Sequence, residues 1–159
     1  MREPEFIKIV KYVRNGLEEQ SHFGVVIHMN KNGIISRAGN DNGYKFFHRS
    51  CMKPLQASVL IDERIDIKYD LTIDEIAICC ASHTGDFVHR ERVLSVLKKT
   101  GFTPDDLLSP PHEPLSDKEK TRLIKENSYF DKIHNNCSGK HAGMLAICGK
   151  NGFDTSNYK

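Results

Sequence analysis

The ten residues His48–Ala57 (HRSCMKPLQA) constrain this chain more than any other stretch, because they place two reactive side chains at the start of a helix. Ser50 and Lys53 are three residues apart, so on a helix they lie on one face. Pro54 supports an early helical turn, where its missing N–H is not needed. The stretch therefore predicts a helix that begins near Ser50 and runs to about Ile65.

The spacing of Ser50 and Lys53 indicates a chemistry but does not fix it. An alcohol is a weak nucleophile until a base takes its proton, and a Lys amine is such a base only if burial or nearby cations lower its pKa. Penicillin-binding proteins and class A β-lactamases use this Ser-x-x-Lys spacing for a Ser nucleophile beside a Lys. The same spacing also describes a helix N-cap followed by a solvated Lys, and the tetrapeptide alone leaves both interpretations open.

The composition fits a soluble globular protein rather than a disordered one. The 159 residues are enough for one domain with a core, and 38% of them are hydrophobic and 28% charged. The net charge is +2 without a basic block, and no apolar run is long enough for a membrane span, so we expect neither nucleic acid nor membrane as a partner. The charged start of the chain has no signal-peptide pattern, so we expect a cytoplasmic protein whose five Cys are reduced thiols or ligands.

Strands are predicted before this stretch and helices after it. The strand segments are residues 6–13, 22–29 and 34–36, separated by a break at Asn15–Gly16 and a turn at 30–33. Three short strands with tight connections indicate an antiparallel meander.

Further helices are predicted at residues 76–80, from Thr84 or Asp86 to about residue 100, at 116–125 and at 142–148. The first of these follows a capping box formed by Thr72 and Glu75, and Gly101 ends the second. The apolar residues at helical spacing, expected to face a core, are Leu55, Val59 and Leu60 in the helix after Ser50 and Val88, Val93, Val96 and Leu97 in the helix before Gly101.

Three polar clusters lie at the entrance to helices, where free N–H groups suit anionic ligands: residues 48–53, 81–85 and 135–141. In the second cluster, Ser82 is either a further reactive hydroxyl or a cap, and His83 is either a site residue or a surface imidazole.

In the third cluster, Cys137 and Lys140 have the spacing of one helix face, and Cys137 with His141 has a spacing that metal ligands use. The alternative is a buried thiol and a solvated Lys.

Four segments of the chain, in order, resemble the Rhizobium etli-type L-asparaginases, the asparaginase II family. The segments are Arg14…Glu19…His22-Phe23-Gly24, Arg49–Gln56 (RSCMKPLQ), Ala81–Asp86 (ASHTGD) and Asn135–Leu145 (NNCSGKHAGML). The resemblance implies an α+β fold with an antiparallel sheet flanked by helices, in the serine β-lactamase and glutaminase class. It also implies hydrolysis of the side-chain amide of L-asparagine to L-aspartate and ammonia.

The resemblance implies a role for each matching residue. Ser50 would be the nucleophile with Lys53 as its base, and Ser82 would be a second hydroxyl that relays protons. Arg49 and His141 would contact the substrate, and the planar guanidinium of Arg49 suits a carboxylate.

Cys137 and Lys140 would bind a zinc ion that helps to hold the substrate, and zinc binding requires a neutral Lys.

Two features of this chain depart from the family pattern. Family members are roughly twice as long, and the family's third zinc ligand, its acidic substrate contact and the second Lys that partners Ser82 are not matched in this chain. Cys51 also occupies a position that is usually small, and it adds a thiol beside the nucleophile.

The resemblance thus predicts that residues 1–159 are the N-terminal half of a single catalytic domain without an internal boundary. We expect an L-asparagine amidohydrolase when the domain is complete, and an inactive chain in isolation. We expect its partner to be a second copy in a homodimer or a missing C-terminal half. Two alternatives stay open: a non-catalytic half-chain, as a fragment or pseudoenzyme, and a penicillin-recognising acyl-serine protein.

Overall fold

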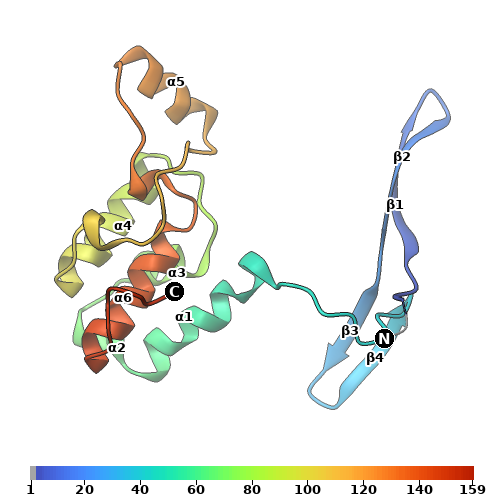
Figure 1. Cartoon of the computed structure of the whole chain (residues 1–159), viewed down its shortest axis with the longest axis horizontal. Helices are drawn as coiled ribbons and strands as arrows, with labels where there is room; N and C mark the ends of the chain where they lie inside the picture. Colours follow the sequence, from blue (N-terminus) through green and yellow to red (C-terminus); the bar gives the residue numbers. More distant parts are fainter. Residues whose placement is uncertain (1–2) are drawn as a thin grey trace. The chain divides into compact units, whose positions relative to one another are not determined.

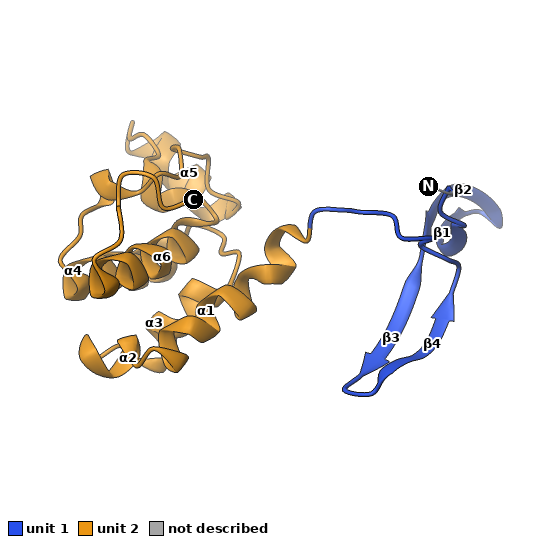
Figure 2. Cartoon of the chain, turned by 60° about the horizontal axis from the view of Figure 1, so that its bottom comes forward, with its two compact units in different colours: residues 1–47 blue, residues 48–159 orange. Residues whose placement is uncertain are grey.

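The computed structural model describes residues 3–159, and the chain forms two compact units, residues 1–47 and 48–159 (Figure 2). The first unit is built from strands and the second from helices (Figure 1), so the prediction of an α+β protein is confirmed. The finer predictions, a β-lactamase and glutaminase class and a single catalytic domain over residues 1–159, rest on the resemblance. We call the two units the hairpin unit and the helical unit.

The hairpin unit contains two β-hairpins, and each is an antiparallel sheet of two strands. The strands are β1 (Ile7–Arg14), β2 (Leu17–Gly24), β3 (Val26–Asn30) and β4 (Gly33–Ala38). Strand β1 pairs with β2, and β3 pairs with β4. A bridge between Glu5 and Asn40 joins the segments that precede β1 and follow β4, with N···O distances of 2.7 and 3.0 Å.

The prediction of one three-stranded meander is wrong. The segment predicted as one strand, residues 22–29, consists of the end of β2 and most of β3, and the strands separate at Val25. Strand β2 (LEEQSHFG) escapes a search for apolar alternation because most of its side chains are polar. Asn15 and Gly16 do not merely break a strand. They form a two-residue hairpin turn with the two positive φ angles, 49° and 80°, that a type I′ turn requires.

Six α-helices and three short 3-10 helices form the described part of the helical unit. The α-helices are α1 (Lys53–Asp62), α2 (Ile65–Lys68), α3 (Ile73–Cys80), α4 (Phe87–Thr100), α5 (Asp117–Lys125) and α6 (Ser138–Asn151). The 3-10 helices are η1 (Arg49–Met52), η2 (Pro104–Asp106) and η3 (Lys132–His134). The long helix predicted from Ser50 to about Ile65 is therefore η1 followed by α1, and α2 begins where the prediction ends.

Local capping fixes several of these helix ends. The capping box before α3 is confirmed, because Glu75 N–H donates to Thr72 Oγ1 (3.3 Å) and Thr72 N–H donates to Glu75 Oε2 (2.6 Å). Helix α4 ends as predicted at Gly101, which has a left-handed backbone (φ 82°). Ser116 caps α5 at the predicted position.

Helix α6 is at the centre of the core, because it packs against α1, α3 and α4 (Figure 1). The largest fully buried apolar side chains are Leu60, Ile65, Leu97, Leu107, Leu145, Val93 and Val96. Two inward predictions are wrong: Leu55 is 64% exposed and Val88 is 60% exposed. Periodicity assigns both to an apolar helix face, but it does not show whether a neighbouring element covers that end of the face.

Two glycines let α6 approach α3 closely. A Cβ on Gly139 would lie 2.2 Å from the Ile78 carbonyl oxygen, and a Cβ on Gly143 would lie 3.1 Å from Cys79 Cβ. Helix α6 begins at Ser138, four residues before the predicted start. Gly139 is therefore a packing residue within the first turn of the helix rather than a loop residue.

Candidate active site

Ser50, Lys53 and Ser82 come together in the helical unit although they lie on three different elements. Ser50 lies on η1, Lys53 is the first residue of α1, and Ser82 follows the end of α3. Lys53 Nζ donates a hydrogen bond to Ser82 Oγ (2.8 Å), and Ser82 Oγ donates one to Ser50 Oγ (2.9 Å). The three side chains form a continuous hydrogen-bonded chain, which we call the Lys–Ser–Ser chain.

Lys53 is the buried end of this chain, with 2% of its surface exposed. Its Nζ also donates to the carbonyl oxygens of Ala81 (3.0 Å) and Asn136 (3.4 Å). These partners are all neutral oxygens, and Lys53 makes no ion pair within residues 3–159. Ser50 and Ser82 are exposed, so the other end of the chain is open to a ligand.

The order within the Lys–Ser–Ser chain differs from the simplest reading of the Ser-x-x-Lys spacing. That spacing suggests a direct contact between Lys53 and Ser50, whereas Ser82 lies between them in the structure. The positions of both serines relative to Lys53 depend on the tertiary packing, which a spacing rule does not describe. The polar cluster at residues 81–85 left Ser82 as either a reactive hydroxyl or a cap, and only the resemblance indicated a second hydroxyl close to Ser50.

Arg49, a predicted substrate contact, directly precedes Ser50 at the start of η1. Its backbone is left-handed (φ 49°), a conformation that costs a non-glycine residue about 1–2 kcal/mol. The side chain is exposed and makes no ion pair within the described residues. Its guanidinium is therefore free to bind an anion close to Ser50.

His141, the second predicted substrate contact, is buried on α6 and outside the Lys–Ser–Ser chain. A hydrogen bond of 2.9 Å joins its Nδ1 to Tyr158 Oη, which also accepts the N–H of Leu108 (2.8 Å). Burial lowers the pKa of His141 to about 4, and the positive charges of Lys140, Lys159 and Lys53 act in the same direction. His141 is therefore neutral at neutral pH.

His83 is not the surface imidazole that the sequence allowed, because only 2% of it is exposed. Its ring forms hydrogen bonds at both nitrogens, with Gly85 N–H and with Ser138 Oγ. Burial, followed by the charges of His89 and Lys53, lowers the pKa of His83 to about 4.

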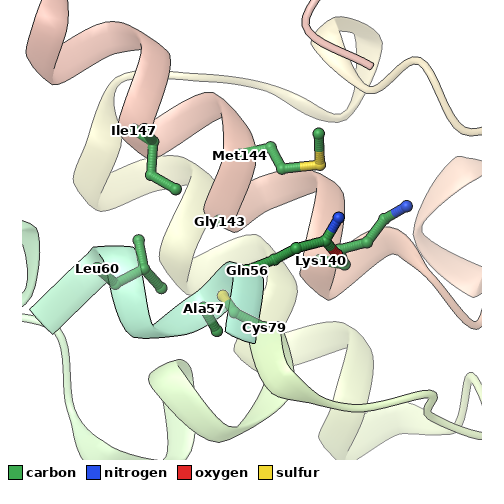
Figure 3. A pocket seen from close by; sticks show the side chains of 8 residues that line it. All are labelled: Gln56, Ala57, Leu60, Cys79, Lys140, Gly143, Met144 and Ile147. Carbon is green, nitrogen blue, oxygen red and sulfur yellow. The ribbon is translucent and has the colours of Figure 1, made fainter. Parts of the chain in front are cut away.

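Of the predicted zinc ligands, Cys137 is the N-cap residue that precedes α6 and Lys140 lies on the first turn of that helix, and both are partly buried. Lys140 lines a cavity of about 10 Å³ among α1, α3 and α6, about the size of one water molecule. Figure 3 shows Lys140 beside Gln56 at one end of this cavity, with Leu60 and Ile147 at the other. Ser50 and Ser82 do not line this cavity.

These two residues do not by themselves complete a zinc site. Zinc takes at least three protein ligands, and Cys137 and Lys140 supply two. Within residues 3–159, no three side chains of His, Cys, Asp or Glu gather in a group that could hold a metal ion. All five cysteines, which belong to the described part of the chain, are free.

One comparison with known proteins gave a match, and it is to a protein family. No curated protein matches the chain. In residues 3–159, no helix has both the length and the apolar character needed to cross a membrane. The L-asparaginase II family matches residues 10–159, a range that includes the Lys–Ser–Ser chain, Arg49, Cys137, Lys140 and His141. The chain therefore belongs to the L-asparaginase II family.

Proposed function

We propose that this chain carries the nucleophile, the proton relay and the base of an L-asparagine amidohydrolase. The family indicates asparaginase-type activity, with asparagine as a small-molecule substrate. The observation that carries the proposal is the Lys–Ser–Ser chain, because it connects an exposed hydroxyl to a buried amine through a second hydroxyl. The family also favours this function over that of a penicillin-recognising acyl-serine protein.

In the first step, Ser50 Oγ attacks the side-chain carbonyl carbon of asparagine. When Lys53 is a neutral amine, the two contacts of the chain are donated in the opposite direction: Ser50 O–H donates to Ser82 Oγ, and Ser82 O–H donates to the lone pair of Lys53 Nζ. The proton of Ser50 then passes to Ser82 Oγ while the proton of Ser82 passes to Lys53 Nζ. A neutral amine has two N–H groups and one lone pair. The carbonyls of Ala81 and Asn136 take the two N–H groups, which leaves the lone pair toward Ser82.

The tetrahedral intermediate then breaks its C–N bond. Ammonia leaves with the proton that returns from Lys53 through Ser82, and Ser50 is left as an aspartyl ester. Water attacks this ester in the second step and gives its proton to the same relay. The ester bond breaks, Ser50 recovers its proton, and L-aspartate is released.

Arg49 and His141 are the proposed substrate contacts. Arg49 is next to Ser50 and has no ion-pair partner in residues 3–159, so it suits the α-carboxylate of asparagine. His141 is neutral, so it offers hydrogen bonding rather than charge. We propose Cys137 and Lys140 as part of a zinc site that a further ligand completes, and no step above passes through the metal.

A diazoketone analogue of asparagine tests the proposal without requiring turnover. In this analogue a diazomethyl carbon replaces the amide nitrogen, so the Ser50 oxygen bonds to that carbon, the carbon takes the serine proton, and N₂ leaves. Lys53→Met should slow formation of the adduct at least about 100-fold, because general-base catalysis contributes about 10²–10⁴-fold.

Lys99→Met is the matched control, because Lys99 is another Lys of the helical unit whose amine is hydrogen-bonded, in this case to Glu75 (2.8 Å). It should leave the rate of adduct formation unchanged. Equal rates for Lys53→Met and the unsubstituted chain would show that Lys53 is not the base.

A second candidate is a non-catalytic chain that keeps the family fold without the complete chemistry. Two observations favour it. The pair Cys137 and Lys140 lacks a third zinc ligand within the described residues. Apolar side chains of the hairpin unit are also uncovered, including Phe23, which is 60% exposed, and Leu17, which is 76% exposed. Such a chain would work in an assembly, as a homodimer or with a separate C-terminal half.

An ammonia-release assay combined with size-exclusion chromatography and light scattering tests the second candidate. The 159-residue chain is expected to release no ammonia from asparagine and to elute as a species larger than its mass of 18.1 kDa. A monomer that hydrolyses asparagine would refute the non-catalytic candidate and show that the catalytic set is complete within these residues.

A further inference from the structure

The position of Lys53 depends on two separate loops. The loop between α3 and α4, residues 81–86, supplies Ala81 O and Ser82 Oγ. The loop between η3 and α6, residues 135–137, supplies Asn136 O. The Lys–Ser–Ser chain therefore keeps its geometry only if these two loops keep their relative positions.

His83 connects the two loops, through both its backbone and its side chain. Its N–H donates to Asn136 O (3.2 Å), the same carbonyl that contacts Lys53 Nζ. On the ring, Nδ1 accepts the N–H of Gly85 (3.1 Å), so the proton of the neutral ring is on Nε2. Nε2–H then donates to Ser138 Oγ (2.8 Å) at the start of α6.

The ring of His83 is held firmly at both ends. Ser138 is fully buried, and its hydroxyl donates onward to Ile133 O (3.0 Å), which fixes its direction. On the other side, Gly85 has a left-handed backbone (φ 77°), and a Cβ there would lie 2.6 Å from His134 O. The loop 81–86 is thus in close contact with the last residue of η3 at Gly85, and the imidazole joins it to the first residue of α6, so both residues that flank the loop 135–137 are held.

We propose that His83 is a positioning residue: its imidazole bridges Gly85 N–H and Ser138 Oγ and so holds the two loops that place Lys53 against Ser82. This inference rests on the proposed function, because it assigns a purpose to the geometry of the Lys–Ser–Ser chain. His83 itself touches neither Ser50 nor the open end of the chain.

Two substitutions of similar size separate the bridging contact from the rest of the side chain. Asn at position 83 keeps an acceptor near Nδ1 for Gly85 N–H but is too short to reach Ser138. Gln reaches further and keeps a donor near Nε2 for Ser138 Oγ. If the contact with Ser138 is what positions Lys53, His83→Gln should keep Lys53 in place and His83→Asn should not.

The test is competitive acetylation of all lysines in the full chain with acetic anhydride, followed by mass spectrometry of each Lys peptide. In His83→Asn, the rate at Lys53 should rise at least about fivefold, the change in local opening that loss of one buried hydrogen bond produces. The rate at Lys99, paired elsewhere in the same unit, should stay constant. In His83→Gln, the rate at Lys53 should stay within about a factor of two of the original chain.

The inference is overturned if Lys53 stays protected in His83→Asn, or if Lys53 and Lys99 gain reactivity together, which would indicate general loosening. If His83→Asn does not fold, Ser138→Ala decides, because it removes only the far end of the bridge and should raise the rate at Lys53 alone. Acetylation requires no turnover, so it can fail while asparagine hydrolysis is confirmed, and the reverse also holds.

Discussion

The hairpin unit and the helical unit differ in how far their apolar side chains are buried. In the hairpin unit, Val10, Tyr12 and Phe23 are 49%, 57% and 60% exposed. In the helical unit, Leu60 and Leu145 are completely buried. The reason is architectural: a two-stranded hairpin leaves both of its faces open, whereas helices packed around α6 enclose a core.

This difference shows which part of the molecule supports the chemistry. Every atom of the Lys–Ser–Ser chain, and both carbonyls that hold Lys53, belong to the helical unit. The hydrogen-bonded geometry therefore depends on the unit that has a core.

The largest expected contrast is between truncations in the two units. Leu60→Ala should lower the free energy of unfolding by about 2–5 kcal/mol, because it leaves a cavity in the core. Val10→Ala should change it by no more than about 0.5 kcal/mol, because the side chain is half exposed. Urea denaturation of the full chain measures both. Equal losses would mean that the hairpin face is covered in solution, and the comparison would fail.

A smaller effect is expected where α6 contacts α3. Gly139→Ala should destabilise the helical unit by about 1–3 kcal/mol, because the new Cβ meets the Ile78 carbonyl. Asn151→Ala, at the exposed end of the same helix, is the control and should have little effect. Thermal unfolding followed by circular dichroism reports both, and an unchanged midpoint for Gly139→Ala would disprove this close contact.

A pH dependence confined to the helical unit is also expected. Burial lowers the pKa of His83 and His141 from 6.5 to about 4, so protonation favours the unfolded chain. Their contribution to stability is complete above pH 6.5 and is lost as the pH falls toward 4, by up to about 1.4 kcal/mol per pH unit for each.

Unfolding midpoints between pH 7 and 4 check this slope. His83→Gln should flatten it, whereas His28→Gln, which alters an exposed side chain of the hairpin unit, should not. Identical slopes for the two variants would contradict a neutral, buried His83.

Features of the fold that depend on neighbouring residues could be predicted from the sequence. The capping box of Thr72 and Glu75, the stop at Gly101 and the start after Ser116 all appear as expected. Each involves hydrogen bonds or a backbone conformation within one helical turn.

Features that depend on tertiary packing could not be predicted in this way. The sequence pattern places Gly139 in a loop, and only the contact of α6 with α3 identifies it as a packing residue. Val88 lies on an apolar helix face that no described element covers at that position. In the candidate active site, the three-residue spacing of Ser50 and Lys53 predicts that their side chains lie near each other. The contacts of Lys53 with Ala81 O and Asn136 O join residues 28 and 83 positions apart, which no local rule anticipates.

The most direct test of the central claim is to identify the residue that the diazoketone analogue of asparagine modifies. Peptide mapping by mass spectrometry should locate one adduct on Ser50, and Ser50→Ala should abolish it. The neighbouring thiol of Cys51 is exposed and provides an internal comparison, because a reagent that reacts without recognition would modify it. An adduct on Cys51 or Ser82, or undiminished labelling of Ser50→Ala, would contradict the assignment of Ser50 as the nucleophile.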